Sequence, residues 1–526
     1  MDRRTFIKTG LGAMGALHLA GKGFFDAKAA TPADGASSAS NLILPNSGRI
    51  LVVVRLDGGN DGLNTVIPLD RMDALARARA NILIPESKLL RLDATTALHP
   101  SLSGLHKVFQ DGNLRILHSV GYPSHNQSHF RSTDIWFTGS DSNQVLESGV
   151  LGRYLEGRFP GFPLGYPNPA QPHPPSIQIG STLLTLLQGG TAGMGMAISD
   201  PSKIYSLQSD GIDVAPETPW GHELTFIRQM ASQTHQYGDA VKAAMAKSTT
   251  KSSLYPATGN RLADQLKGVA RLIGGGLDTS IYVVSMGGFD THSGQVKDSD
   301  TTSGAHADLL RQLSEAVSAF LDDLRLMGLQ DRVIGITMSE FGRRILSNAS
   351  FGTDHGTAGP MFLFGKPVAG GIEGASPEIP HTATARDNVP MQFDFRSVYS
   401  TLLTDWMRAS PSQTRSILQR DFPPVGLLDP GYSFRTPGRV DFVMDPLLHD
   451  PSGSNATLSY TLYDSAPVQI GICDLKGRTV RTVFSSHMPE GRHSMRFATT
   501  GLASGHFLIR MQVAGGVAQQ AFDLVR

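Results

Sequence analysis

The chain is poor in cysteine and carries no net charge. Its 526 residues include one cysteine, Cys473, and Lys plus Arg equals Asp plus Glu at 46 each. A single cysteine excludes an intramolecular disulfide, so an exported form of this chain has to rely on its hydrophobic core for stability. The balanced charge gives no reason to expect nucleic acid or an anionic membrane surface as a partner.

Long apolar runs are also missing. The apolar stretch Leu11–Ala20 is too short to cross a bilayer as a helix, and no other run is long enough, so we expect no transmembrane segment in the mature chain. The stretch follows Arg3 and Arg4 and precedes Ala27–Ala29, a small-residue segment typical of a cleavage site. Residues 1–30 are therefore predicted to be a twin-arginine signal peptide. This signal predicts that the twin-arginine export machinery is a partner of the protein. It predicts a mature protein in the periplasm, at the cell surface or outside the cell.

A credible dinucleotide loop is absent as well. The segment Gly10–Gly15 matches the pattern G-x-G-x-x-G, but no strand precedes it and it lies inside the predicted signal. We therefore reject it as a nucleotide-binding loop. Because the chain also lacks a cysteine cluster and a haem motif, little supports a redox enzyme with a bound cofactor.

The segment from 49 to 432 has the pattern of an α/β domain, after a linker predicted at residues 31–48. The clearest helix runs from about Ala305 to Gly328, with apolar residues at three- and four-residue spacing and Gly328 as a candidate C-cap. It lies between apolar runs at 282–286 and 333–338. A strand–helix–strand unit implies parallel strands with a right-handed crossover, so we expect a doubly wound, mainly parallel sheet.

The composition changes after about residue 433. Short runs with partial alternation, such as 468–474 and 505–511, are separated by turns such as Pro489–Gly491. This pattern predicts a small all-β sandwich over residues 433–526.

Acidic residues and histidines follow the predicted strands of the α/β domain. Asp57 ends the run 50–56, Asp290 and His292 follow 282–286, and Glu340 follows 333–338. In α/β folds, ligands collect beyond the carboxyl ends of parallel strands, so these side chains are expected to gather at one edge. Carboxylates and imidazoles together suit Zn²⁺, Mn²⁺ or Fe, with Mg²⁺ at an all-oxygen position. The candidate metal ligands are Asp57, Asp290, His292, Glu340, Asp354 and His355.

Each candidate also has an ordinary structural explanation. Asp57 lies in a Gly- and Asn-rich segment where Asp often caps turns, and Glu340 suits the first turn of a helix. Ser128 can serve as an N-cap, and Arg131 can pair with a nearby Asp. His118, His125, His129 and His306 are interpreted as ordinary polar residues or as outer residues of the site.

The α/β segment resembles an exported bacterial family, the domain of unknown function 1501. The matching segments are Leu56–Asn64, Ser128–Trp136, Gly149–Leu155, Phe289–His292, Ser339–Arg344 and Gly352–Gly356.

That family looks like a distant branch of the alkaline phosphatase-like superfamily, whose members hold one or two divalent metals beside a nucleophile. The resemblance implies Asp57, Asp290, His292, Glu340 and His355 as metal ligands and Ser128 as the nucleophile, with Ser132 and Thr133 as competitors. Glu340 stands where the superfamily usually has an Asp-His pair, so one imidazole ligand is missing. Either Asp354 compensates for it or only one metal binds. Arg131, close to Ser128, is suited to a bidentate contact with an anionic group, and so is Arg343 or Arg344.

The C-terminal part is similar to the immunoglobulin-like sorting domain of type IX secretion cargo. The resemblance rests on Asp474–Val480, Gly491–His493 and Gly501–Phe507. It implies contact with outer-membrane secretion machinery, although such cargo usually enters the periplasm by the general secretory route rather than the twin-arginine route. The alternative is a β-sandwich appendix that serves only surface attachment or binding.

Together these patterns predict a metal-dependent hydrolase of phosphate or sulfate esters, with one or two divalent ions and an anionic ester as substrate. The alternative is a non-catalytic exported surface protein that uses the same fold to bind a glycan or a protein. The missing Asp-His pair and the competition among Ser128, Ser132 and Thr133 keep this alternative open.

Overall fold

The computed structural model describes residues 48–168, 171–200, 236–432, 442–445, 447–450, 454–474, 478–514 and 516–524. The predicted signal peptide and residues 31–47 of the predicted linker lie outside the described residues. So does the predicted start of the C-terminal region at 433–441.

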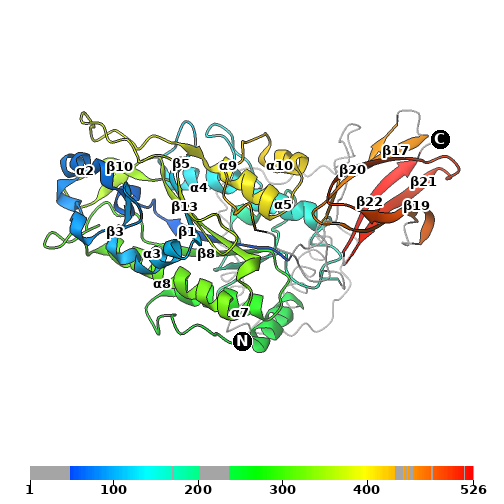
Figure 1. Cartoon of the computed structure of the whole chain (residues 1–526), viewed down its shortest axis with the longest axis horizontal. Coiled ribbons are helices and arrows are strands. Elements are labelled where there is room, and N and C mark those ends of the chain that lie inside the picture. Colours follow the sequence, from blue (N-terminus) through cyan, green and yellow to red (C-terminus); the bar gives the residue numbers. More distant parts are fainter. Residues whose placement is uncertain are drawn as a thin grey trace, which may run out of the picture.

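A nine-stranded sheet forms the centre of the α/β part (Figure 1). Its order is β13-β5-β12-β9-β1-β8-β6-β7, and β14 pairs with β5. All its pairings are parallel except those of β12, which is antiparallel to both β5 and β9. The strands are β1 (Ile50–Asp57), β5 (Leu114–Gly121), β6 (Ser176–Ile179), β7 (Met196–Ile198), β8 (Ile281–Gly287), β9 (Val333–Met338), β12 (Gly359–Phe364), β13 (Gly371–Glu373) and β14 (Phe393–Asp394).

Both faces of this sheet are buried, and β1 shows it most simply. Val52 and Val54 belong to one apolar cluster and Leu51 and Val53 to another, because successive side chains of a strand point to opposite faces. A strand buried on both faces reads as a continuous apolar run, as β1 does. The first face is covered by α3 (Ser103–Gln110), α7 (Arg261–Gly274) and α8 (Ala305–Leu326), and the second by α4 (His129–Thr138), α5 (Val150–Arg158), α9 (Phe395–Thr401) and α10 (Pro411–Leu418).

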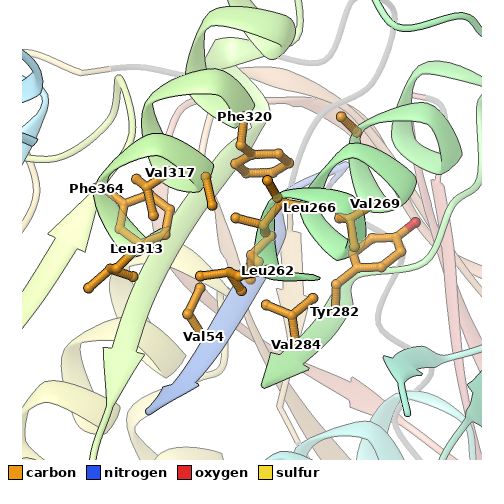
Figure 2. Packing of buried hydrophobic residues seen from close by; sticks show 14 of the residues in the cluster. Val54, Leu262, Leu266, Val269, Tyr282, Val284, Leu313, Val317, Phe320 and Phe364 are labelled. Atoms are coloured by element: carbon orange, nitrogen blue, oxygen red, sulfur yellow. The ribbon is translucent and has the colours of Figure 1, made fainter. Parts of the chain in front are cut away.

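The helix predicted from 305 to 328 is α8. Leu313, Val317 and Phe320 are fully buried against the sheet (Figure 2). Gly328 has a positive φ of 70°, the left-handed conformation expected just after a helix C-terminus. The strands on either side of α8 are parallel, as predicted, but they are not neighbours, because β1 lies between β8 and β9.

Smaller elements surround the carboxyl ends of the strands. The two-stranded ribbon of β10 (Arg343–Ser347) and β11 (Thr353–His355) follows β9. A three-stranded sheet has the order β2-β4-β3 and lies beside a short helix α2. These elements are β2 (Val66–Pro68), β3 (Leu90–Arg91), β4 (Thr96–Leu98) and α2 (Met72–Ala78).

The C-terminal strands form two antiparallel sheets at one end of the molecule (Figure 1). Side chains from both sheets, such as Leu458 and Ile509, share one apolar cluster, which is the packing of a sandwich. The predicted fold class, a doubly wound, mainly parallel α/β sheet followed by a β-sandwich, is thus confirmed. One sheet has the order β15-β17-β16 with β20 beside β17, and the other the order β19-β18-β21-β22. Their bounds are β15 (Phe442–Met444), β16 (Leu448–His449), β17 (Asn455–Leu462), β18 (Ala466–Cys473), β19 (Thr479–Met488), β20 (Gly491–Ala498), β21 (Gly505–Val513) and β22 (Gly516–Leu524).

In the part of the chain that the structure describes, none of the helices combines the length and the apolar character needed to cross a bilayer.

Candidate metal centre

The turns after β1, β8 and β9 meet at one edge of the sheet. Gly58, directly after β1, has a φ of 119°, and a Cβ atom added to it would lie 2.3 Å from the backbone nitrogen of Asp290. Only glycine allows the first turn to approach the second this closely. The Gly58 N–H donates to Oε1 of Glu340 at 2.8 Å, which connects the first turn to the third.

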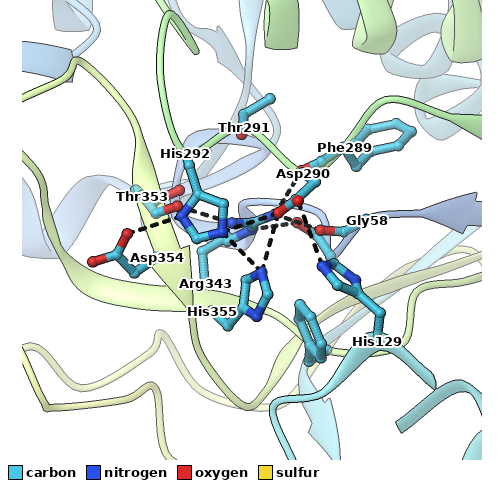
Figure 3. Close-up of polar contacts among 12 residues, drawn as sticks. Gly58, His129, Phe289, Asp290, Thr291, His292, Arg343, Thr353, Asp354 and His355 are labelled. Atoms are coloured by element: carbon cyan, nitrogen blue, oxygen red, sulfur yellow. Dashed lines mark hydrogen bonds and ion pairs between the residues drawn. The ribbon is translucent and has the colours of Figure 1, made fainter. Parts of the chain in front are cut away.

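Asp290 lies at the centre of three imidazoles (Figure 3). Its Oδ1 lies 3.2 Å from Nε2 of His292 and 3.1 Å from Nε2 of His355. Its Oδ2 lies 3.5 Å from Nε2 of His129, the first residue of α4. Potential ligand atoms of Asp290, His129 and His355 all lie within 4.8 Å of one another. The cluster is open to solvent, since the Asp290 side chain is 46% exposed.

Each imidazole has its other nitrogen held by an oxygen acceptor. Nδ1 of His129 lies 2.9 Å from Oε1 of Glu340, and Nδ1 of His292 lies 2.9 Å from Oδ1 of Asp354. Nδ1 of His355 lies 2.9 Å from the carbonyl oxygen of Gln127. A carboxylate or carbonyl oxygen can only accept, so in the neutral rings these contacts assign the proton to Nδ1. All three Nε2 lone pairs are then free.

These free lone pairs face one another and a carboxylate. Nε2 of His292 lies 2.9 Å from Nε2 of His355, and both lie near Oδ1 of Asp290. Burial lowers the pKa of His355, which favours its neutral form. Converging acceptors repel one another unless a cation sits among them, and imidazoles backed by carboxylate or carbonyl groups are the usual environment of a bound metal. The donor set therefore fits a divalent ion.

The buried Arg343 holds the acidic member of this cluster. Its guanidinium donates to Oδ1 of Asp290 at 2.8 Å and to the carbonyl oxygens of Gly59, Phe289 and Thr353 at 2.7, 2.9 and 2.8 Å. Burial raises the pKa of Asp290, but the hydrogen bond and the positive charge of Arg343 outweigh burial and lower that pKa to about 2. Asp290 is therefore ionised at neutral pH.

A second buried network, made of hydrogen bonds, stabilises the backbone of the site. Asp61 accepts from Arg79 at 2.9 and 3.1 Å and from Gln295 at 2.6 Å. Oε1 of Gln295 in turn accepts from Thr291, next to Asp290, at 3.0 Å and from Thr353, two residues before His355, at 2.8 Å. The network thus fixes the backbone beside two members of the cluster.

Asp57 and Glu340 lie behind the cluster rather than in it. The described contacts of the Asp57 carboxylate are with Arg55 and do not include Asp290. Burial raises the pKa of Asp57 to about 6, against the effect of Arg55 and with a further contribution from Glu340. Oε1 of Glu340 accepts from His129, while its buried Oε2 has no hydrogen-bond partner among the described residues.

The residues expected around the nucleophile have different surroundings in the structure. Ser128 is exposed at the N-cap of α4, where its side chain makes no capping hydrogen bond. The Arg131 guanidinium pairs with Asp134 and donates to carbonyl oxygens of residues 141, 142 and 144, so it is committed to a neighbouring loop. The competing Ser132 is fully buried and bonded to Tyr122 and to the Glu340 carbonyl.

Of the six expected ligands, the structure therefore gathers Asp290, His292 and His355 around one point. Glu340 and Asp354 contact the far nitrogens of imidazoles, and Asp57 stands beside Glu340. His129 was interpreted as an ordinary or outer residue and lies in the cluster. The sequence feature that marks His129 is its position at the start of a helix, next to Ser128. Most of the expected ligands instead follow predicted strands.

The fold and the site define a mainly parallel α/β protein with a candidate metal centre beyond its strand ends. Residues 220–416 match a family model described as "Protein of unknown function (DUF1501)". This segment contains Asp290, His292, Glu340, Asp354 and His355, but not His129. No curated protein matches the chain.

Several solved structures have a similar arrangement. A Bacteroides thetaiotaomicron protein from work on glycosaminoglycan metabolism is 9% identical, with 90% of this chain and 89% of that one covered and a TM-score of 0.34. A Vibrio parahaemolyticus protein of the alkaline phosphatase superfamily is 10% identical, with coverages of 81% and 78% and a TM-score of 0.29. A Pseudoalteromonas sulfatase is 12% identical, with coverages of 85% and 83% and a TM-score of 0.29. Likeness at this level does not assign an activity.

The second buried network predicts a large effect of Asp61→Ala on stability. The substitution leaves the fully buried Arg79 guanidinium without its carboxylate, which typically costs about 3–5 kcal/mol. Urea unfolding followed by circular dichroism measures the loss. The matched control is Asp308→Ala, because Asp308 is 68% exposed and pairs with Arg311 at the surface, where such pairs contribute about 0–1 kcal/mol. Equal losses in the two variants would contradict the assigned role of Asp61.

Proposed function

We propose that the chain is an exported, divalent-metal-dependent hydrolase of phosphate or sulfate esters. The observation that carries the proposal is the convergence of the Nε2 atoms of His129, His292 and His355 on the Asp290 carboxylate. Export is proposed from the twin-arginine pattern of residues 1–30, and the placement in the periplasm, at the cell surface or outside the cell follows from it.

Asp290, His292 and His355 are the residues that would hold the ion, with His129 as a further ligand. A mixed set of one carboxylate and several imidazoles suits Zn²⁺, Mn²⁺ or Fe. Such an ion would supply electrostatic stabilisation of an anionic ester and of the charge that develops during its hydrolysis. The exposed side of the cluster leaves room for the ester to approach.

The protein's own contribution is to orient these ligands. Glu340, Asp354 and the Gln127 carbonyl hold the protons of the three imidazoles on Nδ1, so the Nε2 atoms stay available. Arg343 keeps Asp290 ionised and in place. The N-terminus of α4, next to His129, carries a partial positive charge that favours an anionic substrate.

Ser128 remains the proposed nucleophile. It lies between Gln127, whose carbonyl contacts His355, and His129, so its backbone is adjacent to two members of the site. Its exposed side chain is free to meet a bound ester. Arg131 is no longer proposed as the anion-binding group, because its guanidinium is occupied by Asp134 and the loop carbonyls.

The metal site predicts that the protein contains about one or two tightly bound divalent ions. In Asp290→Ala/His292→Ala/His355→Ala the ions should be lost, because the variant removes the converging donors. Metal content by mass spectrometry of protein folded in the cytoplasm measures both. The matched control is His506→Ala/Asp523→Ala, which removes an exposed His–Asp pair from the sandwich. Failure to bind Zn²⁺, Mn²⁺ or Mg²⁺ even after dialysis would contradict the proposal.

The orienting role of Asp354 gives a separate prediction. Asp354→Ala should weaken metal affinity by about 10–100-fold without abolishing binding, as expected for a group that acts through an imidazole. Competition with a chelator of known affinity measures the change, and Asp264→Ala is the control, because the Asp264 side chain is 61% exposed on α7. Complete loss of the ion, as in the triple variant, would instead make Asp354 a ligand itself.

One observation favours the alternative, a non-catalytic surface protein that binds a glycan or a protein. The Ser128 hydroxyl has no described hydrogen bond to the cluster, and a nucleophile needs proximity to the groups that activate it.

Ser128→Ala separates the two functions. If the chain is a hydrolase, the metal-loaded protein should turn over 4-nitrophenyl phosphate or sulfate, and the variant should lose at least about 10³-fold in kcat while keeping its metal. Ser486→Ala, an exposed serine of the sandwich, should change nothing. Absence of turnover in the metal-loaded wild type across a broad ester screen would favour the binding protein.

A further inference from the structure

An exposed aromatic residue follows a member of the metal cluster in the chain. Phe130 is the second residue of α4, directly after His129, and is 90% exposed. Among the large apolar side chains of the described residues that are exposed, it has the highest exposed fraction. A single exposed apolar residue is common on protein surfaces, so its position is what makes Phe130 informative.

The backbone on both sides of Phe130 is fixed. The Gln127 carbonyl contacts His355, and the Gln127 side chain contacts Arg344 at 3.1 Å and Asn388 at 3.3 Å. On the other side, Ser132 is fully buried and its hydroxyl lies 2.8 Å from that of Tyr122. The ring is therefore presented from a rigid helix start, and little backbone freedom remains to be lost when a ligand binds.

A second exposed apolar side chain belongs to the same region. Val145 is 75% exposed and lies in the loop that Arg131 ties to α4 through the carbonyl oxygens of Asp141 and Ser142, at 3.2 and 3.3 Å. Arg131 thus holds the loop that carries Val145 beside the first turn of the helix that carries both His129 and Phe130.

We infer that Phe130 determines specificity by packing against the flat apolar face of a ring in the alcohol part of the substrate. The inference rests on the proposed function, because the anionic group of the ester is then bound at the cluster of Asp290, His292 and His355. The inference requires that the ester oxygen leads from that group along the first turn of α4, where a ring attached to it reaches Phe130. Aromatic side chains bind ring faces with a large contact area and few rotatable bonds to fix.

Two phosphonates that differ only in the ring test this inference. Phenylphosphonate and methylphosphonate present the same anionic group and are not hydrolysed, so calorimetric titration of Zn²⁺-saturated protein gives their dissociation constants without any turnover. We expect the wild type to bind phenylphosphonate about tenfold more tightly. In Phe130→Ala this ratio should fall to near one while methylphosphonate binding stays unchanged. Because the Phe130 ring is exposed, the substitution leaves the fold intact.

Leu254→Ala is the control, since Leu254 is 56% exposed and should leave the ratio unchanged. Cyclohexylphosphonate, as a third probe, separates the two kinds of ring. Equal binding of both rings supports any ring with an apolar face, and tighter binding of phenyl supports an aryl ester. A phenyl preference that persists in Phe130→Ala would overturn the inference but not the proposed function. Failure of both phosphonates to bind the wild type would overturn the proposed function and the inference with it.

Discussion

The buried guanidinium of Arg343 is the interaction on which the rest of the site depends. It binds carbonyl oxygens from the turn after β1, the turn after β8 and the strand β11, together with the carboxylate of Asp290. Three segments far apart in sequence are thereby held by one planar group with five donors. A fully buried positive charge is tolerated because acceptors surround it and one of them is ionised.

The site is built in layers around that group. Asp61 and Arg79 form a buried pair on one side of it, Asp290 and the imidazoles form the cluster that it contacts, and Glu340 and Asp354 contact the Nδ1 atoms of His129 and His292. Each layer fixes the next, so the imidazole nitrogens are oriented without contact from a ligand. The exposed parts of this arrangement are those that a bound ester would touch, and the buried parts are those that hold them in place.

Local pattern predicted most of the fold and three of the residues that lie together in the cluster, Asp290, His292 and His355. The apolar stripe of α8 and the continuous apolar runs of β8 and β9 were sufficient to predict a helix between two buried strands. A helix buried along one stripe and a strand buried on both faces each have a recognisable spacing of apolar residues. The insertion of β1 between β8 and β9 has no such pattern in the sequence, since strand order depends on tertiary packing.

The same limit applies to the site. Asp290 and His292 follow a strand and could be found, whereas His129 reaches the cluster from a helix start 161 positions before Asp290 in the chain. Arg131 was expected to bind an anion, but its partners are carbonyl oxygens of a loop whose position only the folded chain defines.

The hydrogen bond from the Gly58 N–H to Glu340 joins residues 282 positions apart. Closing a loop of that length costs conformational entropy before any contact returns free energy, so this edge of the sheet requires β1 to be paired with β8 and β9. An ion held there would mark chains that have completed folding. If the proposed twin-arginine signal sends the folded chain to its translocase, uptake of the ion and readiness for transport would be the same event.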